Sequence, residues 1–430
     1  MRARLLILAS AIAMLGWGTV LPYQYAYAAD TRGWGALLAA AASSLFSVGA
    51  LLAAPVGGRL ADRVSPVLVA VGAKVIAAAG AASLIWADSP TAFLVGMFVF
   101  GLGITAANPA QSVLVLQWVG GHDRRKVFAW QFTGQALGMA VGAFAAGYVV
   151  DLDRADGMWP AFATAGGGFL VSAALLLVAG MARWGAAPGV DAGAEPGVGS
   201  GTAAVGGAAH EPVRQASPRE ALRAIWAIPA LRWTALITVT LALGFYAQFE
   251  SGLPAYALTV LHVDETTIGL AAAVNCVVII ALQMLVVRLT ANRSGATLLM
   301  GVGLIWTVSW LVLAASALAP QLAAVLFVTT FGIFAVGETM YAPVLNPLTA
   351  SLAPSGLVGT TLGMFTALQT GFSAVGPLVA GVILGAGLGS LFIGLHVAIS
   401  LLAVFGAWRL RATLKAPVAA PRAVEAQLVA

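Results

Sequence analysis

Long apolar runs recur along the whole chain, and their length constrains the fold more than any other feature. Of the 430 residues, 60% are hydrophobic and 9% are charged, against roughly 25% charged residues in an ordinary soluble domain. A membrane-spanning helix needs about 20 consecutive apolar residues, and only helices or closed barrels satisfy their backbone hydrogen bonds in lipid. The pattern excludes a soluble globular enzyme and predicts an all-α integral membrane protein.

The apolar runs form two sets of six, separated by a stretch rich in Gly and Pro. They lie near residues 5–28, 34–57, 66–87, 91–118, 127–150 and 160–182, and then near 230–258, 266–288, 296–318, 321–349, 357–385 and 388–408. We therefore predict twelve transmembrane helices in two pseudo-symmetric six-helix halves. The predicted domains are the halves 1–184 and 217–411, a flexible cytoplasmic linker at 185–216, and a cytoplasmic tail at 412–430.

The first run also resembles a secretory signal peptide. Arg2 and Arg4 precede it, and Ala26-Tyr27-Ala28 looks like a cleavage site. Because the run is longer than a typical signal core and contains Pro22, we interpret it as the first transmembrane helix.

A short amphipathic helix is predicted where the second half begins. Ser217-Pro218-Arg219-Glu220 has the residue types of a helix N-cap with a capping box. The helix that follows is expected to lie on the inner membrane surface before the seventh span.

The distribution of charge predicts the orientation in the membrane. Basic residues gather in the loops on one side, as at Arg59, Arg63 and Arg124-Arg125-Lys126, whereas the other side has mostly aspartates. Under the positive-inside rule, both termini are cytoplasmic. The net charge of +5 is spread over these loops, so we expect no nucleic-acid partner. Abundant Ala, Gly and Arg with little Lys favour a bacterial inner-membrane protein.

The chain lacks residue patterns for catalysis or cofactor binding. Its single cysteine, Cys276, can form neither an intramolecular disulfide nor a metal cluster. It has no His-Glu-x-x-His pair. We therefore predict no enzyme activity, no cofactor and no metal site.

The two halves repeat short motifs at matching positions. Gly58-Arg59-Leu60-Ala61-Asp62-Arg63 follows the second span, and Arg288-Leu289-Thr290-Ala291-Asn292-Arg293 follows the eighth. Leu21-Pro22 ends the first span, and Leu253-Pro254 ends the seventh. Duplicated halves of this kind place a substrate between them, near the middle of the membrane.

This arrangement resembles the major facilitator superfamily. The similarity covers the six plus six spans, the long central loop and the sequence Gly58-x-x-x-Asp62-Arg63. The Gly-rich fifth span, Leu15-Gly16-x-Gly18 and Tyr246-x-Gln248 are similar to the 12-span drug:proton antiporter branch. The chain departs from the family pattern at Ser65, Pro66, Val67, Met97 and Met139. These departures concern the proton relay more than the fold.

The resemblance implies a conformational latch on the inner side. It gives Asp62 the role of binding the N-terminal end of span eleven, which agrees with the preference of a carboxylate for a helix N-terminus. Arg124 or Arg125 is expected to add a charge-assisted bond to Asp62, while Gly58, near Arg63, permits close packing. The alternative is a charged loop that only sets topology.

Glu250 and Glu338 are the only carboxylates inside the predicted spans, where an ionised carboxylate is costly. Desolvation favours the neutral form, so such a group can take up and release a proton as its exposure alternates. Glu338, near the middle of the tenth span, is the preferred proton carrier. Glu250 lies nearer the outer end of the seventh span, as a second carrier or a gate residue. The alternative for both is a neutral structural acid.

The resemblance also implies that spans one, four, seven and ten line the substrate cavity. Their polar and aromatic residues are the candidate contacts: Tyr23, Gln24, Tyr27, Asn108, Gln111, Tyr246, Gln248, Tyr341 and Asn346. Aromatic rings beside few charges suit an amphipathic organic compound. Hydrogen bonding between helices is an equal alternative for any one of these residues.

Small residues predict close helix packing in two spans. They are Gly134, Gly138 and Gly142 in the fifth span, and Gly376 with Pro377 in the eleventh. Lys74 lies about 12 Å from the inner end of the third span by helix rise, so its amino group is expected to reach the interface.

Together these features predict a monomeric secondary active transporter that works by alternating access. The leading hypothesis is proton-coupled efflux of small amphipathic compounds of the drug or antibiotic type. The alternative is uptake or export of a defined metabolite, such as a sugar or an amino acid. The expected partners are the small-molecule substrate, protons and the lipid bilayer.

Overall fold

The computed structural model describes residues 1–181 and 217–415, and every regular element in these ranges is helical. The first half contains α1 (Arg2–Val20), α3 (Ala36–Arg63), α4 (Pro66–Ser83), α5 (Pro90–Trp118), α6 (Gly121–Val149) and α7 (Trp159–Met181). The second half contains α9 (Pro229–Leu241), α11 (Glu265–Leu289), α12 (Gly295–Ala314), α13 (Ala323–Leu352), α14 (Val358–Gly385) and α15 (Gly389–Lys415). The predicted linker lies outside the described residues, and α15 continues past the predicted end of the last span.

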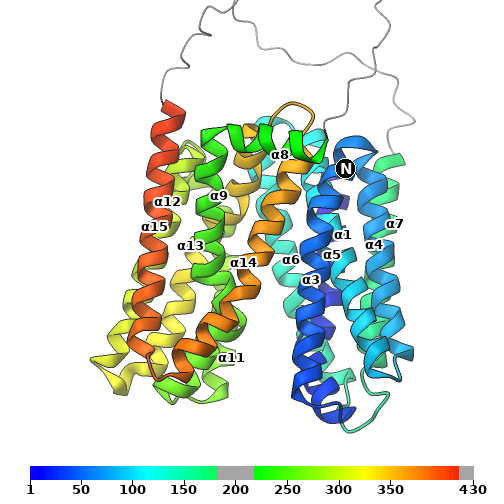
Figure 1. The fold of residues 1–430 in the computed structure, drawn as a ribbon, viewed down its shortest axis with the longest axis vertical. Helices are drawn as coiled ribbons and strands as arrows, with labels where there is room; N and C mark the ends of the chain where they lie inside the picture. The colour runs from blue at the N-terminus through cyan, green and yellow to red at the C-terminus, as the bar shows by residue number, and fades with distance from the viewer. Residues whose placement is uncertain (182–216, 416–430) are drawn as a thin grey trace, which may run out of the picture.

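The helices form two bundles, one for each half of the chain (Figure 1). The bundles meet at the end where α1 begins and α15 ends, which we call the terminal side, and they diverge toward the opposite, far side (Figure 1). Contacts between the halves join α3 to α14, and α6 to α11 and α13. Among the described residues, eleven helices are long and apolar enough to cross a membrane, and a bent pair supplies a twelfth. The predicted two-half, twelve-span fold is confirmed.

The seventh span departs from regular α-helix. After α9 the chain forms π-helical turns at Ala242–Tyr246, Gln248–Gly252 and Ala257–Leu261, with α10 (Leu253–Tyr256) between the last two. π-Helical turns are rare and often occur at functional sites.

α8 (Pro218–Ala227) precedes the seventh span and bends by 93° into it. Ser217 accepts a hydrogen bond from the Glu220 amide, and the Glu220 carboxylate accepts one from the Ser217 amide at 2.7 Å. The predicted capping box is therefore confirmed. At the bend, Arg232 Nε donates to the Trp226 carbonyl at 2.6 Å, which satisfies an orphan carbonyl at the end of α8.

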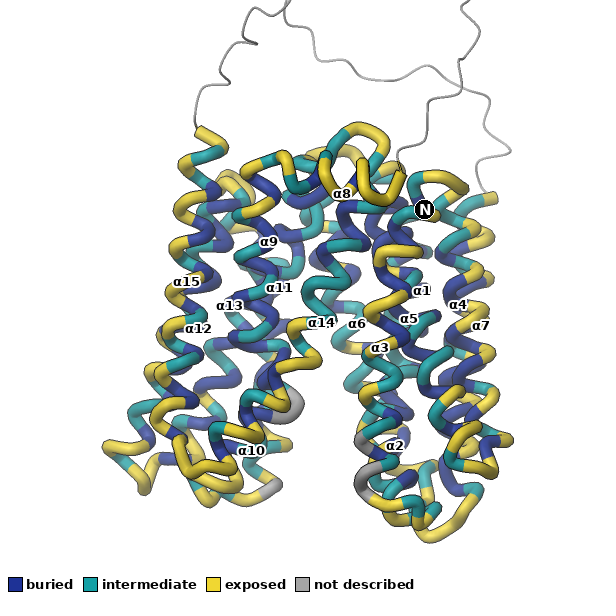
Figure 2. Tube along the Cα trace, viewed as in Figure 1, coloured by how far each residue is buried: buried dark blue, intermediate teal, exposed yellow. Residues whose placement is uncertain are grey.

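Burial follows the pattern expected of helices in lipid. Buried residues lie mainly on the sides of the helices that face their own bundle, and exposed positions follow the outer sides (Figure 2). Many exposed side chains are large and apolar, including Val382 and Leu378, which are 75% and 70% exposed. Such a surface suits the hydrocarbon of a membrane.

Candidate functional site

Glu338 lies in the interior of the second half, 5% exposed, on α13. Asn275 of α11 donates from Nδ2 to Glu338 Oε2 at 2.8 Å, and the same amide approaches the Phe331 carbonyl at 3.4 Å. The Tyr246 hydroxyl also reaches the carboxyl group. α11, α13 and the seventh span thus converge on one acidic group, held by neutral donors.

Aromatic rings surround this carboxyl group. The Tyr246 ring lies 5.6 Å from that of Tyr341 and 6.3 Å from that of Trp306, between centroids. Trp306 Nε1 donates to the Phe334 carbonyl at 3.1 Å, which fixes the indole. Tyr246 is only half-buried, so one side of this aromatic group remains accessible. The buried Tyr341 hydroxyl has no partner among the described residues.

Sequence reasoning missed Asn275 and its neighbour on the same helix, Gln283. Gln283 is buried and donates to the Thr339 carbonyl at 2.9 Å, while its Oε1 has no partner in the described part of the chain. Both residues lie on the eighth span, which the family resemblance does not assign to the cavity. The sequence could have indicated both residues, because an amide side chain within an apolar run needs a hydrogen-bond partner.

In the first half, the predicted cavity residue Gln111 belongs to a buried polar cluster. Ser10 of α1 donates to Gln111 Oε1 at 2.8 Å, and Gln131 of α6 donates to the Ser10 hydroxyl at 3.1 Å. These bonds join α1, α5 and α6 within one half. Asn108, one turn earlier on α5, is exposed. Of the two predicted residues on the fourth span, only Asn108 is therefore available to a ligand.

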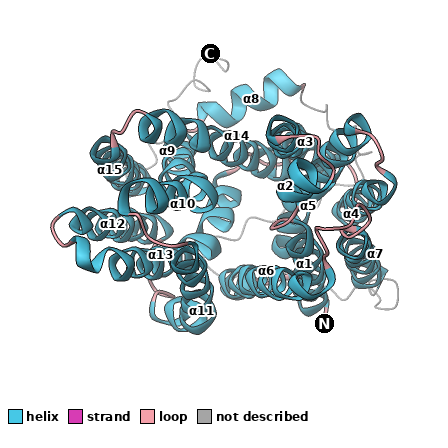
Figure 3. Cartoon of the chain, turned by 90° about the horizontal axis from the view of Figure 1, so that it is seen from below, coloured by secondary structure: helices cyan, strands magenta, loops and turns pink. Residues whose placement is uncertain are grey.

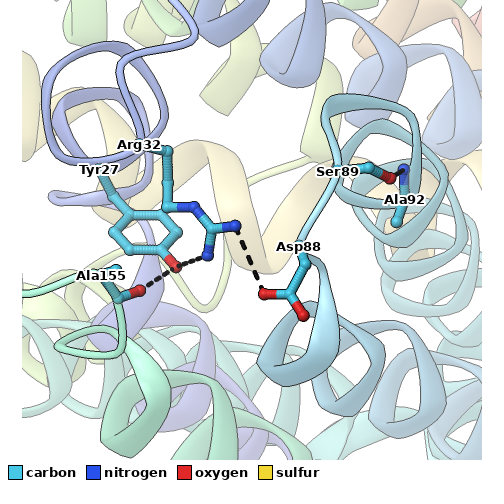
Figure 4. Close-up of polar contacts among 6 residues, drawn as sticks. All are labelled: Tyr27, Arg32, Asp88, Ser89, Ala92 and Ala155. Carbon is cyan, nitrogen blue, oxygen red and sulfur yellow. Dashed lines mark hydrogen bonds and ion pairs between the residues drawn. The ribbon is translucent and has the colours of Figure 1, made fainter.

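Tyr27 has a structural role at the far side, which differs from the cavity position predicted for it. It is 1% exposed, and its hydroxyl donates to the Ala155 carbonyl at 2.7 Å. Arg32 donates to the Tyr27 hydroxyl and approaches Asp88 at 3.5 Å (Figure 4). Its guanidinium group also lies over the Trp34 ring. This network ties three far-side segments together, because Tyr27 and Arg32 belong to one segment and their partners Ala155 and Asp88 to two others.

The other predicted cavity residues differ in exposure. Tyr23 and Asn346 are half-buried, whereas Gln24 is buried and its Oε1 has no partner among the described residues. Gln248 is 1% exposed, and its amide approaches the Gly376 carbonyl at 3.5 Å. The side chain of Glu250 lies outside the described part of the structure, so its predicted role stays a prediction.

Three of the predicted packing glycines bring backbones together. Extra methyl groups at Gly138 and Gly142 of α6 would collide with the backbones of Ala11 and Leu15 in α1. At Gly134, a methyl group would make only ordinary contacts, with the side chains of Ala11 and Ile7 at 3.5 Å and the Ile7 carbonyl at 3.7 Å. In α14, Gly376 packs in the same way against Ala247 of the seventh span, and the next residue, Pro377, is exposed.

Lys74 does not reach the interface, so that expectation is wrong. Its side chain is 2% exposed, and Nζ lies 5.1 Å from the centroid of the Phe169 ring. Helices α4 and α7 enclose the amino group, and the aromatic face supplies a cation–π contact.

Asp62 joins the two halves at the terminal side. Its Oδ1 accepts from the Gly359 amide at 2.5 Å, and its Oδ2 accepts from the amide and hydroxyl of Thr360, both at 2.6 Å. Both amides belong to the first turn of α14, where free N–H groups favour an anion. Gly58 lies directly against Gly359, and a side chain at either position would collide with the other helix.

Neither Arg124 nor Arg125 forms a hydrogen bond with Asp62 among the described residues, contrary to expectation. Arg124 donates to the Leu116 and Val119 carbonyls at the end of α5, at 2.8 and 3.1 Å. Arg125 crosses to the other half and donates to three carbonyls of the loop that directly follows α11, those of Thr290, Ala291 and Arg293, at 3.1 to 3.4 Å. Helix C-termini carry unpaired carbonyls, which are good acceptors for a cation. Arg63 is exposed at the end of α3.

A cavity of about 580 Å³ lies beside these contacts at the terminal side. Asp62, Arg124 and Arg125 line it, together with the ends of α5 and α13 and the start of α14. The contacts between the halves therefore border a space large enough for a small organic molecule.

The fold and these contacts define a multi-pass helical membrane protein whose two halves are joined at one side. The family model described as Major Facilitator Superfamily matches residues 6–377. The chain belongs to this family, whose members are transporters rather than enzymes.

Sequence relatives match only part of the chain. Over 148 residues it is 27% identical to the Multidrug resistance protein MdtH of Aeromonas salmonicida (strain A449), a match that covers 34% of this chain and 37% of that protein. The chain thus spans about a third of the length of the curated relatives it matches.

Solved structures match over nearly the whole chain. A bacterial homologue of the iron transporter ferroportin, in an outward-facing state, is 15% identical with a TM-score of 0.76, covering 96% of this chain and 100% of that one. The fucose:proton symporter of E. coli is also 15% identical, with a TM-score of 0.67 and coverage of 94% and 98%. At this identity, the similarity establishes the shared fold alone.

Proposed function

We propose that this protein is a proton-coupled exporter of small amphipathic compounds in the bacterial inner membrane. The observation that carries the proposal is the Glu338 carboxyl group, enclosed with Asn275 and the aromatic residues Tyr246 and Tyr341. A carboxyl group in such surroundings can hold a proton in one state and lose it in another. The partial similarity to a multidrug resistance protein supports the export of varied compounds.

The proposed mechanism is exchange by alternating access. Following the charge distribution, we assign the terminal side to the cytoplasm, so that the described state is closed inward by the Asp62 and Arg125 contacts. A proton that arrives from outside on Glu338 favours release of the substrate from the adjacent aromatic residues. Loss of that proton toward the inside then resets the carrier. Glu250 is a second candidate for the same role.

Glu338→Gln tests this proposal in proteoliposomes. The amide can still hydrogen-bond to Asn275 and Tyr246, but it cannot titrate, so we expect flux driven by a pH gradient to be lost. Counterflow of substrate without a gradient should persist, because it needs no net proton movement. Asp153→Asn, in an exposed loop, is the control for loss of one carboxylate.

Gradient-driven flux at the parent level in Glu338→Gln would contradict the proton-carrier role. A panel of cationic, neutral and anionic compounds, tested in the same vesicles, decides the substrate class. Transport confined to one sugar or amino acid would replace the exporter with the metabolite transporter.

A further inference from the structure

α8 has two faces with different chemistry. Ala221 and Ile225 are buried against the protein, whereas Arg219, Leu222 and Arg223 are exposed. With 3.6 residues per turn, the two arginines lie one above the other, largely opposite the buried pair. Leu222, which is 48% exposed, lies between the arginines and the buried face. The helix therefore shows a basic surface with an apolar residue beside it.

The position of α8 places these residues at the level of a membrane surface. The 93° bend into α9 turns α8 across the ends of the spanning helices instead of along them. Seen along the helices, α8 lies on the outer rim of the molecule beside α14 (Figure 3). A helix that runs across the rim at the end of the spans meets the headgroup layer of the surrounding leaflet.

The one acidic group of α8, Glu220, attracts Arg223 electrostatically but forms no ion pair with it among the described residues. Glu220, on the same helix, is bound to the Ser217 amide through the capping box. Neither Arg219 nor Arg223 forms an ion pair among the described residues. Two cations at a membrane surface that form no ion pair with any described residue are complementary to the phosphates of anionic lipids.

We propose that α8 is a docking surface for anionic phospholipid headgroups in the leaflet on the terminal side. Arg219 and Arg223 bind the lipid phosphates, since a guanidinium group can donate two parallel hydrogen bonds to one phosphate. Leu222 enters the boundary between headgroups and acyl chains, as apolar residues of interfacial helices do.

Lipid bound at α8 would stabilise the contact between the two halves. Ile225 packs with Leu231 and Ala235 of α9 against Phe365 of α14. Phe365 lies roughly 8 Å along α14 from the amides of its first turn, by helix rise. Those amides bind Asp62. A headgroup that holds α8 in place therefore steadies the end of α14 to which Asp62 binds.

Lipid titration of the full-length protein in detergent, followed by native mass spectrometry, tests the proposal. Phosphatidylglycerol should bind the parent more tightly than phosphatidylcholine does. Each cation near an anionic surface contributes an amount equivalent to roughly five-fold in affinity, so Arg219→Gln/Arg223→Gln should weaken phosphatidylglycerol binding by about 25-fold. Arg411→Gln/Lys415→Gln removes two cations from the end of α15 at the same side and should have little effect. Arg219→Lys/Arg223→Lys should restore most of the affinity.

Hydrogen exchange measures the second part of the proposal. In nanodiscs that contain phosphatidylglycerol, the amides of 359–365 should exchange more slowly than in pure phosphatidylcholine, and the double glutamine variant should lose this difference. Parent-like binding of phosphatidylglycerol by the glutamine variant would overturn the proposal. So would an equal loss in the α15 control, because the effect would then be one of general charge. Competition by soluble glycerol phosphate would assign the site to free phosphate instead of lipid.

Discussion

Asp62→Asn tests the contact that joins the two halves at the terminal side. The carboxylate accepts three hydrogen bonds from the first turn of α14, at 2.5 to 2.6 Å. Asparagine has one acceptor oxygen in place of two, and its amino group faces N–H and O–H donors. When the asparagine oxygen faces Thr360, the side chain keeps the two bonds from Thr360, which are then bonds to a neutral acceptor. It loses the bond from the Gly359 amide.

The size of the effect follows from these bonds. A hydrogen bond to a charged group contributes about 1.5–3 kcal/mol, and an anion at a helix N-terminus contributes up to about 2 kcal/mol where it is partly buried. Allowing for the two neutral bonds that remain, we expect the joined state to lose about 2–3 kcal/mol, or about 30- to 160-fold in population ratio. A parent ratio of about 99:1 would become between about 3:1 and 1:2.

Spin labels on the two halves can measure this ratio. His122 at the start of α6 and Ser355 between α13 and α14 are exposed at the terminal side, and labelled cysteines there, with Cys276→Ala, report the distance between the halves. Asp62→Asn should add a population at longer distance, whereas Asp153→Asn, at the far side, should not. An unchanged distance distribution in Asp62→Asn would refute the reasoning, since the three bonds would then contribute nothing to joining the halves.

Three further variants test separate contacts. Arg125→Gln should weaken the joined state by about 1 kcal/mol, because the three bonds of Arg125 are longer than those of Asp62 and partly solvated. The same spin labels measure this change, and an unchanged distance distribution would show that Arg125 does not help to join the halves. Gly138→Ala should lower thermal stability by about 1–3 kcal/mol through overpacking, while Gly134→Ala, which has room, should be near neutral. Asn275→Ala should cost about 1–3 kcal/mol by removing one of the two donors to Glu338 and leaving Tyr246 alone. The neighbouring Cys276→Ala should be tolerated, and equal melting temperatures for the two variants would contradict this.

The features that the sequence predicted well depend on short stretches of chain. Twelve apolar runs predict twelve spans, because length and apolarity alone decide whether a helix can cross a membrane. The capping box at Ser217 and Glu220 is equally local, since both partners lie within one turn. The π-helical turns of the seventh span were not predicted. No local residue pattern marks a π-helical turn, and these turns contact α13 and α14, which lie far away in the sequence.

A site residue could be predicted from the sequence only where its residue type is rarely tolerated inside a membrane. Glu338 drew attention because a buried carboxylate is costly in any helix. Its donor Asn275 comes from α11, and no local pattern reports which helix will face the acid. Tyr27 was predicted as a cavity residue because of its span, but its hydroxyl meets the Ala155 carbonyl, a partner far away in sequence. Arg124 was expected to bond to Asp62, but it donates to carbonyls at the end of α5.

The repeated loop motif explains why two chemically different contacts join the halves. In the first half, Asp62 brings a negative charge to the N-terminus of α14. At the matching position of the second half, the motif has neutral Asn292, which cannot supply that charge to the facing helix α6. A contact between the halves still forms there, but with the opposite charge: the cationic Arg125 of α6 donates to the carbonyls of the loop. In both places a charged side chain meets backbone groups near a helix end. Substituting the partner side chains would remove only the bond from the Thr360 hydroxyl to Asp62 and would leave the backbone bonds in place. The strength of each contact therefore depends on one charged residue, and both charged residues, Asp62 and Arg125, belong to the first half.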